Sequence, residues 1–120
     1  TTCPIVTHMF CNGGNFYMVK QNGRSIGYLK LVDKGNRVAE IVVVIGDEAM
    51  WNKGFGTAAV KLAMQECFFR LRYERLSAVI RHGNEGSHHV FSKAGFTVDC
   101  TLNSSIRYVL ELDQYLKLAA

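Results

Sequence analysis

Several common sequence features are missing from this chain of 120 residues. No apolar segment approaches the roughly 20 residues that a membrane-spanning helix needs. No basic stretch followed by an apolar one marks a signal peptide. The cysteines have no metal-ligand spacing; they are Cys3, Cys11, Cys67 and Cys100. We therefore expect no membrane span, no bound metal, and buried thiols in a reducing cytoplasm.

Repeats and low-complexity segments are also absent, and the length fits a single domain over residues 1–120. Apolar residues make up 48% and charged residues 20%, as in an ordinary soluble protein. The net charge of +4 suits an anionic ligand. Because the basic residues are spread along the chain and form no stripe with aromatic ones, nucleic-acid binding is not expected.

The most informative stretch is residues 39–59, AEIVVVIGDEAMWNKGFGTAA. Residues 41–45 are all β-branched, which predicts a strand buried on both faces. A break at 46–48 and a glycine-rich turn then lead into a helical pattern. A helix start offers free N–H groups and a positive dipole end, and glycines let a ligand approach the backbone. The stretch predicts a phosphate or pyrophosphate cradle, although the two glycines alone also fit a tight loop entering a helix.

Hydrophobic periodicity and turn residues set the expected elements. We expect strands at 16–20, 25–32, 37–45, 75–81, 96–102 and 106–116, and helices at 55–72 and 84–93. Residues 1–15 contain no element that we can place. The order is β-β-β-α-β-α-β-β, an α/β (α+β) chain. The crossover helix makes 41–45 and 76–80 parallel neighbours in an otherwise antiparallel sheet.

Two blocks of this sequence resemble the GNAT superfamily of acetyl-coenzyme A-dependent N-acetyltransferases. Residues 51–56, WNKGFG, stand where that family has Arg/Gln-x-x-Gly-x-Gly/Ala after a strand. Residues 84–96 resemble the Asn-x-x-Ser…Lys-x-Gly-Phe block of its RimJ/RimL-like branch. The resemblance covers roughly residues 16–118. It implies a GNAT-like sheet whose parallel pair is splayed at the cofactor site, with the family's first strand and two following helices missing or reduced to 1–15.

The resemblance also implies how acetyl-coenzyme A binds. Its pyrophosphate would lie on the backbone N–H groups of 52–57, with Lys53 either adding charge or remaining a solvated side chain. Its pantetheine arm would pair with the backbone of Val44 and Ile45 like an added strand. The predicted cofactor contacts are Val42, Val44, Ile45, Trp51, Asn52, Lys53, Gly54, Phe55, Gly56, Thr57, Asn84, Ser87 and Phe91.

Catalytic roles follow from the same resemblance. Glu40 stands at the family's interval for a general-base glutamate; the alternative is a surface charge at a strand end. Phe91 occupies the position of the family's general-acid tyrosine and cannot donate a proton, so Ser87 becomes the candidate acid. Asn84 and Ser87 also fit a helix cap. The histidines at 82, 88 and 89 cluster near that helix start without metal-ligand spacing.

The chain is thus predicted to transfer an acetyl group from acetyl-coenzyme A to a primary amine. A protein N-terminus, an amino sugar and a polyamine all remain open as acceptors. One alternative, suggested by Phe91, is a non-catalytic acyl-coenzyme A binding or sensing module. Another is a structural subunit whose active site needs a partner chain, and a homodimer is also open.

Overall fold

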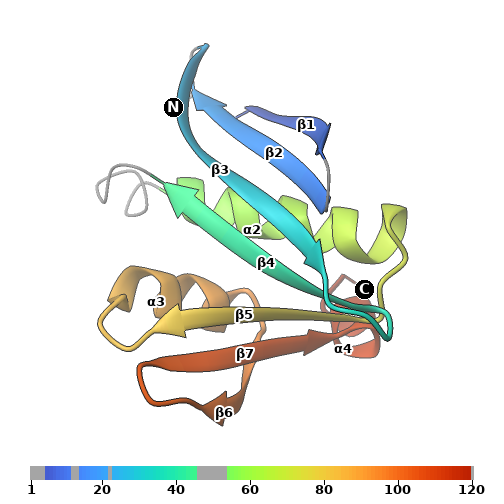
Figure 1. Cartoon of the computed structure of the whole chain (residues 1–120), viewed down its shortest axis with the longest axis vertical. Helices are drawn as coiled ribbons and strands as arrows, with labels where there is room; N and C mark the ends of the chain where they lie inside the picture. Colours follow the sequence, from blue (N-terminus) through green and yellow to red (C-terminus); the bar gives the residue numbers. More distant parts are fainter. Residues whose placement is uncertain (1–4, 12–13, 22, 46–53, 120) are drawn as a thin grey trace.

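The computed structural model describes residues 5–11, 14–21, 23–45 and 54–119 (Figure 1). The elements are β1 (Ile5–Cys11), β2 (Gly14–Gln21), β3 (Arg24–Asp33), β4 (Val38–Ile45), α2 (Phe55–Gln65), the π-helical turn η1 (Glu66–Arg70), β5 (Arg75–Arg81), α3 (Glu85–Lys93), β6 (Thr97–Thr101), β7 (Ser105–Glu111) and α4 (Leu112–Ala119). The predicted order β-β-β-α-β-α-β-β is confirmed as β2 to β7. β1 precedes it and α4 follows it.

Within the described residues the strands form one seven-stranded sheet in the order β1-β2-β3-β4-β5-β7-β6. The β4–β5 pair is parallel. The other pairs are antiparallel. This is the predicted mixed sheet, with its parallel pair formed across the helical crossover. β5 and β7 are neighbours because β6 lies outside them at the sheet edge.

The N-terminal part of the chain differs from the sequence-based expectation. β1 pairs antiparallel with β2 along its whole length, from Ile5 opposite Lys20 to Cys11 opposite Gly14. Leaving residues 5–11 without an element was therefore wrong. β1 is an edge strand held by backbone pairing to β2, the next strand along the chain, and backbone pairing leaves a weak side-chain pattern.

The C-terminal part also differs, since β7 ends at Glu111 and residues 112–119 form a helix instead of extending the strand to 116. The Leu112 N–H donates to the Glu74 carbonyl at 2.9 Å, where the chain leaves the sheet. Tyr115 then packs on the rings of Phe68 and Phe69, with centroids 4.9 and 5.4 Å away. Leu112 and Tyr115 are three residues apart, so a helix places them on the same face. A strand would place them on opposite faces, because its side chains alternate.

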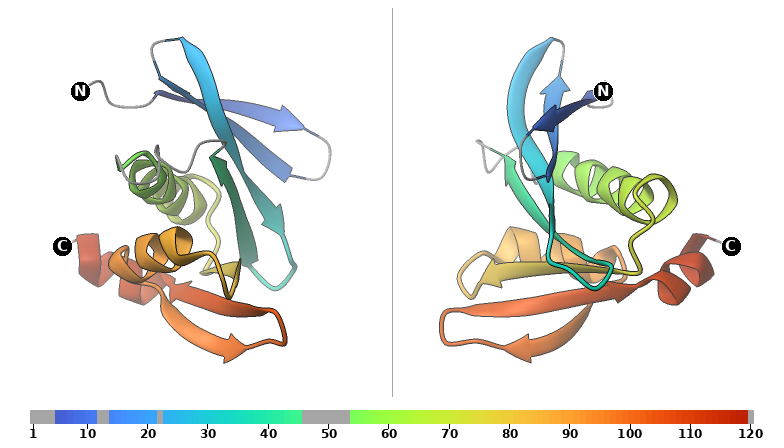
Figure 2. Two further views of the ribbon diagram at one scale, coloured as in Figure 1. Left: turned by 90° about the vertical axis from the view of Figure 1, so that its left-hand side faces the viewer. Right: turned by 45° about the vertical axis from the view of Figure 1, so that its right-hand side comes forward.

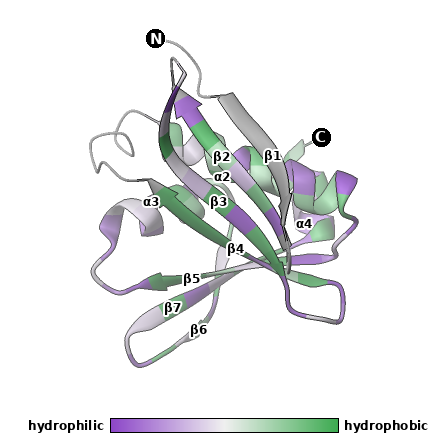
Figure 3. Ribbon diagram, turned by 45° about the horizontal axis from the view of Figure 1, so that its top comes forward, coloured by the Kyte–Doolittle hydropathy of each residue, from purple (hydrophilic) through white to green (hydrophobic). Residues whose placement is uncertain are grey.

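The hydrophobic core lies on one face of the sheet, where α2, α3 and α4 gather (Figure 2). Alternate strand residues such as Leu29, Leu31 and Ile41 are buried against this helical layer. Figure 3 shows how hydrophobic β4 is along its course. No described helix covers the opposite face, which carries Glu40 and Val42. None of the described helices is long and apolar enough to span a membrane.

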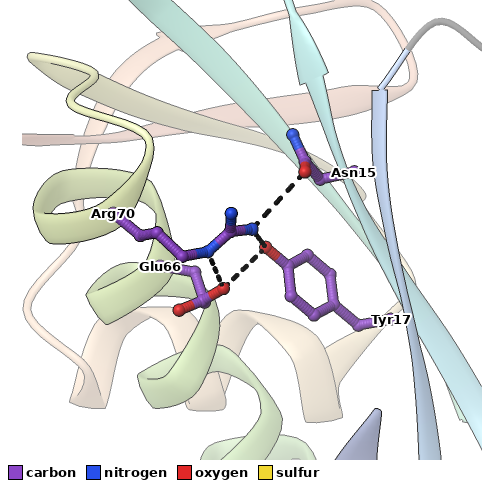
Figure 4. A network of polar contacts seen from close by, with 4 residues as sticks. All are labelled: Asn15, Tyr17, Glu66 and Arg70. Atoms are coloured by element: carbon purple, nitrogen blue, oxygen red, sulfur yellow. Dashed lines mark hydrogen bonds and ion pairs between the residues drawn. The ribbon is translucent and has the colours of Figure 1, made fainter. Parts of the chain in front are cut away.

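A polar network ties β2 to the end of the α2–η1 segment (Figure 4). The Tyr17 hydroxyl donates to Glu66 Oε1 at 3.1 Å and accepts from Arg70 Nη2 at 3.1 Å. Arg70 also forms a 2.6 Å ion pair with Glu66 and donates to Asn15 Oδ1 at 3.4 Å. Burial raises the pKa of Tyr17 to about 12. The network therefore fixes where the helical layer meets the sheet.

Candidate active site

The parallel strands β4 and β5 pair over only three positions, and the last of these joins Glu40 to Ser77. Beyond it the two strands spread apart, as Figure 1 shows, although β4 runs on to Ile45 and β5 to Arg81. Past Glu40, the edge of β4 that faces β5 has no strand partner in the described part of the chain. Unpaired backbone groups of this kind can hydrogen-bond an extended ligand. The predicted splay is thus confirmed.

A cavity of about 250 Å³ lies between the parted strands. It is lined by β4, β5 and α3 through Glu40, Ile41, Val42, Val43, Val79, Ile80, Arg81, Asn84, Ser87 and Phe91. Successive strand residues point to opposite faces of a sheet, yet both Ile41 and Val42 line this space. Residues from both faces of the sheet therefore line the cavity.

Glu40 lies at the closed end of this gap. It is half-buried and is the last residue of β4 that pairs with β5. Among the described residues no hydrogen bond or ion pair holds its carboxylate. A carboxylate without an internal partner beside a cavity is free to accept a proton or to bind a cation.

The N-terminal part of α3 and its cap line the cavity through Asn84, Ser87 and Phe91. Asn84 Oδ1 accepts a hydrogen bond from the Ser87 N–H at 3.2 Å, so the predicted cap is confirmed. This cap uses the backbone of Ser87 and leaves its hydroxyl for other contacts. Phe91 is 1% exposed and packs edge-to-face on Phe96 at 5.1 Å, so its position lines the cavity without offering a proton donor.

The N-terminus of α2 has a different construction. Gly54 takes a left-handed conformation with φ of 87°, and no side chain caps the helix. The first helical hydrogen bond runs from the Ala58 N–H to the Gly54 carbonyl at 3.0 Å, so the N–H groups of residues 55–57 precede it. Phe55 and Gly56 are buried. The predicted contacts Trp51, Asn52 and Lys53 and the Ile45 side chain lie outside the described residues.

The histidines near α3 make structural contacts. His88 Nε2 donates to the Arg81 carbonyl at 2.8 Å, and its Nδ1 is 2.8 Å from the Tyr108 hydroxyl. His82 Nε2 donates to the Leu102 carbonyl at 3.1 Å. Within the described residues no three His, Cys, Asp or Glu side chains are grouped as a metal site. His88 thus joins α3 to β5 and β7.

The sequence of this chain matches a known protein family. Residues 6–97 match the acetyltransferase (GNAT) domain, a match that spans well over half of the chain. The chain belongs to the GNAT acetyltransferase family.

Two curated relatives of this GNAT chain have partial overlap with it. It is 33% identical over 85 residues to the spermidine N(1)-acetyltransferase of Escherichia coli K12, which covers 69% of the chain and 45% of that relative. It is 37% identical over 60 residues to the N-acetyltransferase 9-like protein of Nematostella vectensis, covering 50% of the chain and 30% of the relative. The chain thus spans less than half the length of both.

Solved structures with the same fold include two N-acetyltransferases. A mutant form of the spermidine/spermine N-acetyltransferase SpeG from Vibrio cholerae matches with a TM-score of 0.78 and 20% identity, over 91% of this chain and 70% of that one. Campylobacter jejuni N-acetyltransferase PseH in complex with acetyl coenzyme A matches with a TM-score of 0.71 and 17% identity, over 84% and 70%. The GNAT-like fold is therefore confirmed.

The cavity between the parted strands is also lined by residues that were not predicted from the sequence. They are Ile41, Val43, Val79, Ile80 and Arg81. The signal that could have found the β5 residues is the parallel pairing, since parallel strands end at the same side of a sheet. Predicting them required knowing that the strands separate after Glu40, which no local pattern encodes.

Proposed function

We propose that this chain transfers the acetyl group of acetyl-coenzyme A to a primary amine. The observation that carries the proposal is the cavity between β4 and β5, which Glu40 and Ser87 both line. Because residues from both faces of the sheet line it, the two substrates are proposed to reach it from opposite faces. Such an arrangement suits a direct transfer between two bound substrates.

The coenzyme is proposed to bind from the helical side. Its pyrophosphate lies on the uncapped N-terminus of α2, where free N–H groups and the helix dipole favour an anion. Its pantetheine arm pairs with the free edge of β4 near Val44 and Ile45. An N–H near Val42 polarises the thioester carbonyl.

Glu40 is the proposed general base. An alkyl amine is a cation near neutral pH, with a pKa of about 10.4, so one proton must leave before its nitrogen can attack. Glu40 takes that proton directly or through a water. The nitrogen then bonds to the carbonyl carbon, the C–S bond breaks, and the second amine proton passes to the departing thiolate. Ser87 is proposed to relay that proton: its hydroxyl donates its own proton to the thiolate and takes up the proton that leaves the nitrogen.

The blocks at 51–56 and 84–96 support placing the chain in the RimJ/RimL-like branch, as one acetyltransferase domain over residues 1–120. The relatives leave the acceptor as a proposal. The Escherichia coli relative is named for spermidine, and a Vibrio cholerae neighbour is described in complex with CoA and spermine. A polyamine is therefore one acceptor class to test.

A second candidate function is a non-catalytic acyl-coenzyme A binding module. It is favoured by Phe91, which places a hydrocarbon ring where a proton donor would serve catalysis. Such a module would bind acetyl-coenzyme A without consuming it.

The two functions separate in one experiment. The chain is incubated with acetyl-coenzyme A and a panel of amines while free thiol is measured, and binding is measured by calorimetry. Amine-dependent thiol release supports the acetyltransferase. Tight binding with no thiol release for any amine would instead support the binding module. A specific activity that rises with protein concentration would add the need for a partner chain.

A further inference from the structure

A second cavity, of about 210 Å³, meets the first at Glu40. Its lining comes from five segments and consists of Lys34, Val38, Glu40, Arg75, Ser77, Asp99, Arg107 and Val109. Ser77, Arg107 and Val109 occupy the strand face opposite Ala78, Tyr108 and Leu110, which are buried under the helices. The second cavity thus lies on the uncovered face of the sheet and shares one carboxylate with the cavity between the strands.

The charges in this second cavity are mixed and largely unpaired. Arg75 is already held by Glu111, with Nη2 2.6 Å from Oε1. In the described part of the chain neither Lys34 nor Arg107 makes an ion pair, and the one hydrogen bond of Arg107 goes to the weak acceptor Cys100 Sγ at 3.5 Å. Two cations are therefore available to a ligand anion, beside the carboxylates of Glu40 and Asp99.

This charge pattern discriminates between classes of amine. A polyamine carries several cations and no anion, so binding here would set its charges against Lys34 and Arg107. An amine that also carries a carboxylate complements both signs. Its ammonium group can lie at Glu40, beside the cavity between the strands, while its carboxylate takes charge-assisted hydrogen bonds from Arg107 and Lys34.

We propose that the second cavity is the acceptor site and that its substrate is a small amine bearing a carboxylate, such as a free amino acid. This rests on the proposed acetyl transfer and specifies its acceptor. A volume of about 210 Å³ is below the roughly 300–1,000 Å³ of sites for drug-sized ligands, which agrees with a small molecule. The acceptor enters from the uncovered face and the coenzyme from the helical face, and the two meet at Glu40.

The test compares matched acceptors on the full chain. Thiol release from acetyl-coenzyme A is measured with L-alanine, L-serine and L-glutamate, with the α-amide of each, and with spermidine. The wild-type chain should show a higher kcat/KM for each acid than for its amide, and spermidine should be the poorest acceptor. Arg107→Gln should lower the acid-to-amide ratio by about tenfold or more, as expected for a lost charge-assisted hydrogen bond.

Lys61→Gln is the matched control, because it removes a cation on an exposed position of α2 away from both cavities; it should leave the ratio unchanged. The proposal is overturned if spermidine is acetylated better than every amino acid. An acid-to-amide ratio near one in the wild type, or a ratio unmoved by Arg107→Gln, would also overturn it. In these cases some amine is still acetylated and the proposed function stands. If none of the amines causes thiol release, the proposed function itself is removed.

Discussion

The two helix starts beside the cavity differ in how they satisfy their backbone. α3 begins with Asn84, whose side chain accepts the Ser87 N–H at 3.2 Å. α2 begins with Gly54 in a left-handed conformation and has no side-chain cap. A capped start has one fewer donor to offer a ligand, whereas an uncapped start keeps its first N–H groups available. The difference supports the proposal that the α2 start holds the coenzyme pyrophosphate, whereas the α3 start is satisfied by its own cap.

Gly54→Glu should have the largest effect, because it changes the uncapped start of α2. A carboxylate at the α2 start would be placed against the coenzyme phosphates, and like-charge contact costs several kcal/mol. We expect acetyl-coenzyme A affinity to fall by about 10³-fold. Calorimetry on the folded variant measures this effect.

Gly23→Glu controls for backbone strain, since Gly23 has a φ of 76° and open space around its Cα, much as Gly54 does. It should lose stability without losing affinity. If the two variants bind acetyl-coenzyme A equally well, the pyrophosphate does not lie at the α2 start.

Glu40→Gln separates coenzyme binding, which is proposed for the start of α2, from the proton transfer that is proposed for Glu40. Acetyl-coenzyme A affinity should be retained, while turnover at neutral pH should fall by roughly 10²-fold or more, as for a lost general base. The deficit should shrink as pH rises, because the amine then loses its proton unaided. Wild-type turnover from pH 6 to 9 in this variant would leave Glu40 as a strand-end charge.

At α3, two substitutions separate the cap from catalysis. Asn84→Ala removes the capping acceptor and should lower the free energy of unfolding by about 0.5–2 kcal/mol. Ser87→Ala keeps the backbone N–H that Asn84 binds, so the cap should persist. It should lower turnover more than it weakens acetyl-coenzyme A binding. Urea unfolding and steady-state kinetics on both variants test this, and unchanged turnover in Ser87→Ala would remove its hydroxyl from the mechanism.

Near the far end of the α2–η1 segment, the buried Cys67 thiol makes the stability of the fold depend on pH in the alkaline range. Burial raises the pKa of the Cys67 thiol from 9.0 to about 12. The folded state therefore favours the protonated thiol. This contribution is complete below about pH 9 and is lost as pH rises toward 12. Cys67→Ala should flatten the fall of unfolding free energy between pH 8 and 11, measured in urea. Equal slopes for the wild type and Cys67→Ala would show that Cys67 does not link folding to pH.

Much of this fold follows from local sequence patterns. The β-branched run at 41–45, the glycine before α2 and the Asn84 cap depend on interactions within a few residues, so their signals lie within the same few residues. The helical crossover then makes β4 and β5 parallel. These features were sufficient to predict the central elements and the family.

Contacts between elements decided the rest. β1 forms by backbone pairing with the next strand, β2. α4 leaves the sheet because Tyr115 packs on Phe68 and Phe69, which lie far away in sequence. The alternating pattern after residue 105 fits a longer strand equally well when this partner is unknown.

The sequence by itself determined which residues carry the motif chemistry, because strand, turn and cap preferences are local properties of the chain. The family resemblance implied that the parallel strands splay, but only the tertiary structure placed their separation directly after Glu40, so that one carboxylate lines two cavities. The tertiary structure also brought Lys34 together with Asp99 and Arg107, which lie far from it in sequence on the paired strands β6 and β7. Their meeting depends on the order and register of strands in the sheet, which backbone pairing and core burial fix together.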